Sequence, residues 1–204
     1  LNLYIYNNTG IEPEEWWFHD FIEEAMNIDI DVTFLTKENR NEIMLVISAM
    51  GKTTNAIEKA LANFRANNGH LEITALSEII EYHENIMTDL FEGNTSHPIF
   101  ETMTNLFLDL YLNLQETGFD YDYQYDNTVS FGEMLSTTLI SAYLNECGIR
   151  NELIDARDYI VTDHGFRSAN PEWDDCRLRI EKLKSNERVM YITQGFIASS
   201  VSPK

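Results

Sequence analysis

The chain has 204 residues, of which 34 are acidic and 14 basic, so its formal net charge is −20. Its content of 44% hydrophobic and 12% aromatic residues is enough to bury a core, which excludes disorder along the whole chain. Nucleic acids and anionic membranes bind basic surfaces, so we expect neither as a partner. We find no apolar run that could span a bilayer and no signal-peptide pattern, and we therefore expect a cytoplasmic protein.

The first forty residues contain two strand-like segments around a helix-like one. Apolar residues at 3–6 and 30–35 predict strands, and Pro13 opens an aromatic stretch around Trp16-Trp17-Phe18 that is typical of a helix. This order is consistent with a βαβ unit. No Gly/Ser-rich or Pro-rich linker marks a boundary, and we treat residues 1–40 as a divergent N-terminal segment.

The strongest strand signal lies at residues 42–48, where five consecutive residues are apolar. Such a run is typical of a strand that is covered on both faces. Gly51 follows, and then Thr53-Thr54-Asn55 can cap a helix whose apolar residues recur at helical spacing. Residues 42–68 are therefore predicted to form a strand, a tight turn and a helix.

Further helices are predicted over residues 71–91, 98–118 and 130–146, where apolar residues recur at helical spacing. Residues 119–126 between them alternate acidic and aromatic side chains, which resembles a calcium loop. Tyr125 and Phe131 stand where such a loop requires glycine and a bidentate acid, so we predict a solvated or edge strand instead.

The rest of the chain alternates short strands with a charged helix. Strands are predicted over residues 151–156, 159–162 and 187–193, and the helix over residues 170–184. Strands that alternate with helices predict an α/β fold, here a three-layer α/β/α sandwich with a parallel or mixed sheet.

The turn at residues 48–55 is the first candidate site. It contains Gly51-Lys52-Thr53, but a phosphate loop needs a glycine five residues earlier, where this chain has Val46. What remains is a hydroxyl-rich turn between a strand and a helix N-terminus, where α/β sheets bind anions and small ligands. An ordinary helix cap explains the same residues equally well.

Two other segments are candidates. Glu133 lies in the first turn of an otherwise apolar helix, where it either complements the helix dipole or is held in place to bind an ammonium group. Residues 193–199 take a buried strand into a turn at Gly195, which is either a plain strand end or part of the same site.

These segments together resemble the aspartate kinases of the amino-acid kinase family. The motifs ISAMGKTTNAIEKAL, VSFGEMLSTTLISAYLNECGI, DARDYIVTDHGFRSA and VMYITQGFIAS occur in the family's order and spacing, over about residues 41–199. The resemblance implies an amino-acid kinase-like substrate-binding domain at residues 41–204. It also implies the family reaction, in which ATP, with Mg²⁺, phosphorylates the side-chain carboxylate of L-aspartate to 4-phospho-L-aspartate for lysine, threonine and methionine synthesis.

The resemblance also implies roles for individual residues. Ser48 and Thr54 would contact the substrate aspartate, Glu133 would pair with its α-ammonium group, and Phe196 would close over it. Family members usually dimerise, so a homodimer is expected. Arg157 and Arg167 could approach the substrate, although structural salt bridges are the simpler prediction for both.

Two family segments are not found in this sequence. The first is a Lys-Phe-Gly-Gly strand whose lysine holds the transferred phosphate; residues 1–41 contain a single lysine, Lys37. The second is a Gly-Arg-Glu-Gly-Ser-Asp segment whose arginine binds the substrate carboxylate, together with the nucleotide half and the regulatory domains that follow it. We therefore expect a fold that is incomplete at both ends and no phosphoryl transfer by this chain alone. The alternative is a catalytically inactive binding or docking module, with Trp16-Trp17-Phe18 as its surface.

Overall fold

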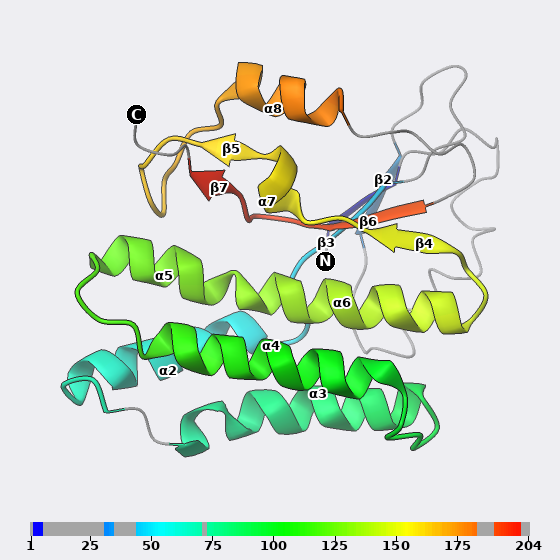
Figure 1. The fold of residues 1–204 in the computed structure, drawn as a ribbon, viewed down its shortest axis with the longest axis horizontal. Helices are drawn as coiled ribbons and strands as arrows, with labels where there is room; N and C mark the ends of the chain where they lie inside the picture. Colours follow the sequence, from blue (N-terminus) through cyan, green and yellow to red (C-terminus); the bar gives the residue numbers. More distant parts are fainter. Residues whose placement is uncertain (1, 6–30, 35–43, 71–72, 183–189, 201–204) are drawn as a thin grey trace.

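The computed structural model describes residues 2–5, 31–34, 44–70, 73–182 and 190–200. A parallel sheet lies between two layers (Figure 1). Long helices cover one face, and two short helices with a small pair of strands cover the other. This is the predicted α/β/α arrangement.

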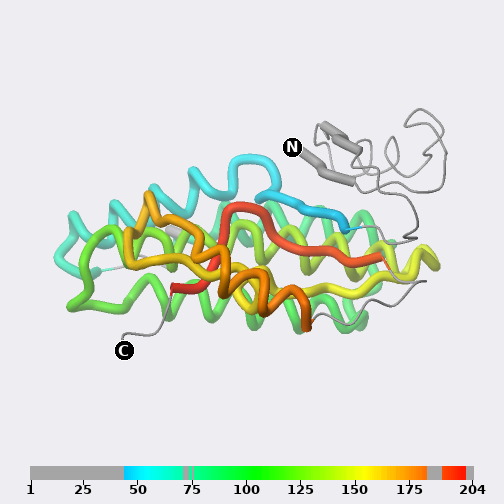
Figure 2. Tube along the Cα trace, turned by 90° about the horizontal axis from the view of Figure 1, so that it is seen from above, coloured from blue at the N-terminus to red at the C-terminus, as the bar shows by residue number. Residues whose placement is uncertain are grey.

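The central sheet has the strand order β3-β6-β4, and all of its strands run parallel (Figure 2). Strand β6 (Met190–Gln194) lies in the middle between β3 (Met44–Ile47) and β4 (Asn151–Leu153), with Leu45 in register with Ile192. Both of these side chains are fully buried. The continuous apolar run thus predicted β3, but burial on both faces is wrong for this strand, because its residues alternate between half-buried and buried. Four of the five residues of β6 are buried.

Two strands from the N-terminal segment pair in parallel, namely β1 (Asn2–Ile5) and β2 (Asp31–Phe34). Strand β1 also lies beside β3. Strands were predicted at both places, so these two predictions are confirmed. The helix predicted from Pro13 and the cluster Trp16-Trp17-Phe18 lie outside the described residues.

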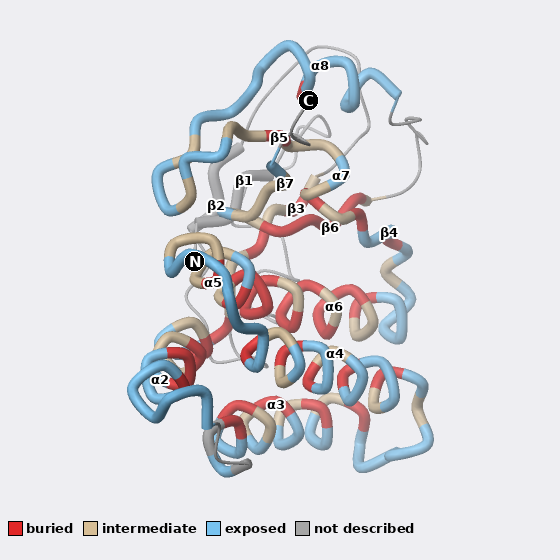
Figure 3. The backbone as a smooth tube through the Cα atoms, turned by 60° about the vertical axis from the view of Figure 1, so that its left-hand side comes forward, coloured by how far each residue is buried: buried red, intermediate tan, exposed pale blue. Residues whose placement is uncertain are grey.

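The helical layer is centred on α6, which packs on the sheet with one side and on α2 and α4 with the other. Burial follows this arrangement, because α6 is buried on most sides whereas α3 and α4 expose their outer faces (Figure 3). No helix among the described residues is long and apolar enough to cross a membrane. The layer comprises α2 (Thr53–Ala66), the 3₁₀ turn η2 (Ile73–Leu76), α3 (Ser77–Leu90), α4 (Pro98–Leu114), α5 (Tyr121–Val129) and α6 (Phe131–Glu146).

The opposite face of the sheet carries shorter elements. Helix α7 (Ala156–Tyr159) follows β4, and strand β5 (Val161–Thr162) pairs in parallel with β7 (Ser199–Ser200). Helix α8 (Trp173–Ile180) packs against α7 and β5, and Cys176 is its buried residue. This part of the fold brings the chain after β4 and the chain after β6 together at one end of the sheet.

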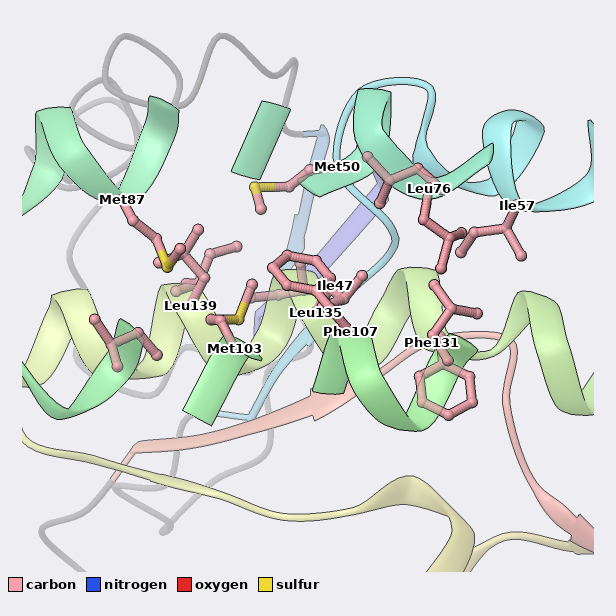
Figure 4. Close-up of a cluster of buried hydrophobic side chains, with 14 of the residues drawn as sticks. Ile47, Met50, Ile57, Leu76, Met87, Met103, Phe107, Phe131, Leu135 and Leu139 are labelled. Carbon is pink, nitrogen blue, oxygen red and sulfur yellow. The ribbon is translucent and has the colours of Figure 1, made fainter. Parts of the chain in front are cut away.

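One apolar core joins the sheet to the helices. Ile47 from β3, Met50 from the following turn and Leu135 from α6 are buried together (Figure 4). Met103 and Phe107 from α4 extend the same cluster away from the sheet. The core therefore fixes the start of α6 against the end of β3, and this contact positions the candidate site.

The strand predicted at residues 119–126 is wrong, because this segment enters helix α5. Asp120 caps the helix by accepting a hydrogen bond from the backbone N–H of Asp122 at 2.9 Å. The buried residues of α5 are Gln124 and Thr128, four positions apart, whereas its tyrosines lie at least partly exposed. Because polar residues occupy the buried positions, the hydrophobic pattern showed the tyrosine alternation and missed the helical spacing.

Candidate functional site

A cavity of about 500 Å³ opens beyond the C-terminal ends of β3 and β6. Thr54 at the start of α2 and Glu133 at the start of α6 line one side, and Arg157 of α7 and Phe196 after β6 line another. Segments that lie far apart in the sequence therefore meet where parallel strands end, as expected for a ligand site in an α/β fold.

The turn between β3 and α2 requires its glycine. Gly51 has φ = +55°, a left-handed conformation that side chains with a Cβ disfavour. A Cβ at this position would lie 2.6 Å from the hydroxyl oxygen of Tyr82. The N–H of Thr53 donates to the carbonyl of Met50 at 3.2 Å and closes the turn, which places Thr54 at the cavity wall.

Helix α6 begins in direct contact with that turn. A Cβ at Gly132 would lie 2.9 Å from the Cβ of Ala49 and 3.3 Å from the hydroxyl oxygen of Thr54. The hydroxyl of Ser136 donates to the carbonyl of Ser48 at 2.8 Å. The absence of a side chain at Gly132 thus lets the helix approach the turn closely and brings Glu133 beside Thr54.

Glu133 is a buried acid that lines the cavity. Glu133 is 8% exposed, and its carboxylate accepts hydrogen bonds from the backbone N–H groups of Ala49 and of Glu133 itself. Burial raises the pKa of Glu133, and the two N–H groups offset part of that rise. Within the described part of the chain it forms no salt bridge. A cationic ligand group beside this carboxylate would favour its charged form and lower its pKa.

Ser48 and Phe196 differ in how they relate to the cavity. Phe196 lines its rim, is 95% exposed and has φ = +59°, an uncommon conformation for a bulky residue. Ser48 is half-buried and does not line the cavity; a Cβ built on Gly195 would lie 3.7 Å from its hydroxyl oxygen. The structure thus brings Thr54, Glu133 and Phe196 to one cavity and places Ser48 next to it.

Gln194 is a structural residue of the site that the sequence did not reveal. Its side-chain amide donates to the hydroxyl of Thr137 at 3.0 Å and accepts from the backbone N–H of Ala156 at 2.8 Å. This buried residue connects β6 with α6 and α7 beside the cavity. A polar side chain at the end of an apolar strand was the signal that could have identified it.

The two arginines considered from the sequence have different environments. Arg167 pairs with Asp122, its Nη1 lying 3.6 Å from the carboxylate, and its guanidinium covers the ring of Tyr125, so a structural role is confirmed. The salt bridge predicted for Arg157 is confirmed as well, because Arg157 binds Asp155 through Nε and Nη2, the shortest contact being 2.6 Å. Arg157 also lines the cavity.

Comparison with known proteins shows the family to which the chain belongs. The model of the amino acid kinase family matches residues 30–204. The bifunctional aspartokinase/homoserine dehydrogenase 1 of Arabidopsis thaliana is 23% identical over 92% of this chain and 21% of its own length. Aspartokinase 1 of the same plant is 35% identical over 59% of this chain, and the aspartokinase of Chlamydia pneumoniae is 28% identical over 86% of it.

Solved structures of aspartokinase III from E. coli have a similar fold. The complex with lysine and aspartate has a TM-score of 0.58 and 25% identity over 77% of this chain. The complex with aspartate and ADP has a TM-score of 0.63 at 23% identity over 89% of this chain, and it supports the fold alone. The chain spans between about a fifth and two fifths of the length of these relatives. Because the family model covers most of the sequence, the chain belongs to the amino acid kinase family.

Proposed function

We propose that this chain is the substrate-binding portion of an aspartate kinase and that L-aspartate is its phosphoryl acceptor. The names of its relatives and the aspartate in the E. coli aspartokinase III complex support this assignment. The observation that carries it is Glu133, a buried carboxylate that lines a cavity and forms no salt bridge among the described residues.

In this proposal each predicted site residue has a defined task. Glu133 binds the α-ammonium group of aspartate, because the ammonium charge offsets the cost of keeping the carboxylate ionised and buried. The hydroxyl of Thr54 donates a hydrogen bond to a substrate carboxylate from the cavity wall. Ser48 holds the same turn against α6, because its carbonyl accepts a hydrogen bond from the hydroxyl of Ser136. Phe196 at the rim covers the bound amino acid and excludes water.

ATP and Mg²⁺ enter the proposal as the co-substrate of the family reaction. Among the described residues no group of His, Cys, Asp or Glu side chains could hold a metal ion, and Arg157 is the one basic residue that lines the cavity. Phosphoryl transfer depends on neutralising the phosphate charges, so the described residues do not fit MgATP. We therefore assign no step of the transfer to these residues, and a cytoplasmic location and a homodimer stay predictions from the sequence.

Calorimetric titration with L-aspartate tests the assignment. We expect the wild-type chain to bind and Glu133→Gln to weaken binding by about tenfold or more, because a neutral amide cannot replace an ionic hydrogen bond to an ammonium group. Thr54→Val should also weaken binding by about tenfold or more, through the loss of one hydrogen bond to a charged carboxylate.

Glu101→Gln is the matched control, since this acid lies on the exposed side of α4. It should bind aspartate like the wild type. If the wild-type chain binds no aspartate, or if Glu133→Gln and Thr54→Val leave its affinity unchanged, the proposal fails and the reading as a docking module gains support. Thermal melting of each variant shows whether it is folded.

A further inference from the structure

The charges around the cavity are unequal. Glu133 and Asp126 line it as acids, and Arg157 is the one basic side chain among the described lining residues. L-Aspartate carries two carboxylates and one ammonium group. If Glu133 binds the ammonium group, both ligand carboxylates still face an acidic wall in a chain of net charge −20. The family resemblance assigns one substrate carboxylate to the arginine of a Gly-Arg-Glu-Gly-Ser-Asp segment, so a cation within the cavity is still needed for the other carboxylate.

Arg157 is held in a fixed orientation. Asp155 caps α7 by accepting from the backbone N–H of Arg157 at 2.9 Å, and the same carboxylate accepts from its Nε at 2.9 Å and its Nη2 at 2.6 Å. Burial raises the pKa of Asp155, but the contacts with Arg157 together outweigh burial and keep this pKa below its usual range. One residue therefore fixes both the backbone and the guanidinium of Arg157, which lowers the entropy that a ligand contact would cost.

Asp155 does not use all the N–H donors of the Arg157 guanidinium. A guanidinium carries five N–H donors, and Nη1 makes no hydrogen bond within the part of the chain that the structure describes. The side chain is 38% exposed although the residue lines the cavity, so a ligand can reach it. Arg167, by comparison, covers the rings of Tyr121 and Tyr125 and does not line the cavity.

We propose that Arg157 is a carboxylate anchor of the cavity and binds one of the two carboxylates of the amino-acid ligand while Glu133 binds its ammonium group. This inference rests on the proposed function and extends it to a residue that the family resemblance did not assign to the substrate. Asp155 is then a positioning residue, because it acts on the ligand through Arg157.

Titration of the full chain with L-aspartate and with succinate tests this anchor. Succinate keeps two carboxylates and lacks the ammonium group, so it depends on Arg157 but not on Glu133. We expect Arg157→Gln to lower the affinity for both ligands by about ten- to hundredfold, because a charge-assisted hydrogen bond is lost. Arg157→Lys should retain an intermediate affinity, because lysine keeps the charge but not the planar fork. Arg167→Gln is the matched control and should bind like the wild type.

Two further ligands separate binding from a structural effect. L-Asparagine lacks the side-chain carboxylate, and β-alanine lacks the α-carboxylate. The penalty of Arg157→Gln should disappear for the ligand that lacks the carboxylate held by Arg157. Equal penalties for all ligands, or wild-type affinity of Arg157→Gln for aspartate and succinate, would overturn the proposal. If the wild type binds succinate through Arg157 but does not bind aspartate, the anchor stands and the aspartate assignment fails.

Discussion

Helices α4 and α6 pack against each other but bury different kinds of side chain. The first half of α6 buries Glu133, Ser136 and Thr137 next to the cavity. The buried polar groups of α6 find partners in the turn after β3 and at the end of β6. Helix α6 also buries apolar residues that belong to the core, whereas the buried residues of α4 are all apolar. Burial therefore stabilises the fold at both helices and organises a site only at α6. The buried residues of α4 form one stripe, namely Ile99, Met103, Phe107, Leu110 and Leu114.

The largest expected effect comes from the apolar stripe. Leu110→Ala should lower the free energy of unfolding by about 2–5 kcal/mol, because Leu110 is fully buried and its removal leaves a cavity. Leu112→Ala on the exposed side of the same helix should change it by less than about 0.5 kcal/mol. Urea unfolding measures both. Aspartate affinity of the folded Leu110→Ala protein should be unchanged, and a change would show that the two regions are not separable.

Gly132→Ala tests whether the close contact between the start of α6 and the turn after β3 positions the site. Its new Cβ would meet the Cβ of Ala49, so the start of α6 must move away from the turn. We expect a loss of about 1–3 kcal/mol in stability together with weaker aspartate binding. Adding Ala49→Gly makes room for the methyl group and should restore part of both. No rescue in the double variant would mean that the contact between turn and helix does not position the site.

Gln194→Leu tests whether the hydrogen bonds of the buried Gln194 side chain stabilise the protein beside the site. The substitution leaves the buried N–H of Ala156 without its partner, at a cost of about 1–3 kcal/mol in the free energy of unfolding. It also removes the hydrogen bond that the Thr137 hydroxyl accepts, although this hydroxyl still donates to the carbonyl of Glu133. Gln115→Leu is the control, because Gln115 is exposed at the end of α4. Chemical denaturation of the two variants should differ clearly; similar values would argue that the buried amide contributes nothing.

The smallest expected effect is a pH dependence from His83 in α3. Its Nδ1 lies 2.7 Å from the carbonyl of Ile79, its Nε2 has no partner within the described residues, and burial lowers its pKa. Below a pH of about 6.5 the unfolded chain takes up a proton that the folded chain resists, so stability falls as the pH decreases. The slope from this residue stays below about 1.4 kcal/mol per pH unit.

His83→Gln should remove this part of the slope between about pH 6.5 and pH 5, measured by urea unfolding at each pH. His164→Gln is the control, since His164 is exposed, and it should retain the wild-type slope. An unchanged slope in His83→Gln would show that the buried imidazole is not the group that titrates.

The sequence predicted most of the fold where side-chain pattern and burial coincide. The apolar run before Gly51 and the spacing of Ile99, Met103 and Phe107 identified β3 and α4. The pattern failed at α5, where Gln124 and Thr128 are the buried residues. Hydrophobic periodicity detects apolar faces, so a helix that buries polar residues escapes it.

What the sequence alone determined is the local chemistry of this protein: its acidic charge, its strands and helices, and the motifs that contain Thr54, Glu133 and Phe196. The tertiary structure decided which of these residues meet. It brought Arg157 to the same cavity as Glu133 and placed Ser48 outside that cavity. The reason is geometric, because strands that are distant in sequence become neighbours in a parallel sheet, and only their pairing determines which loops share an edge.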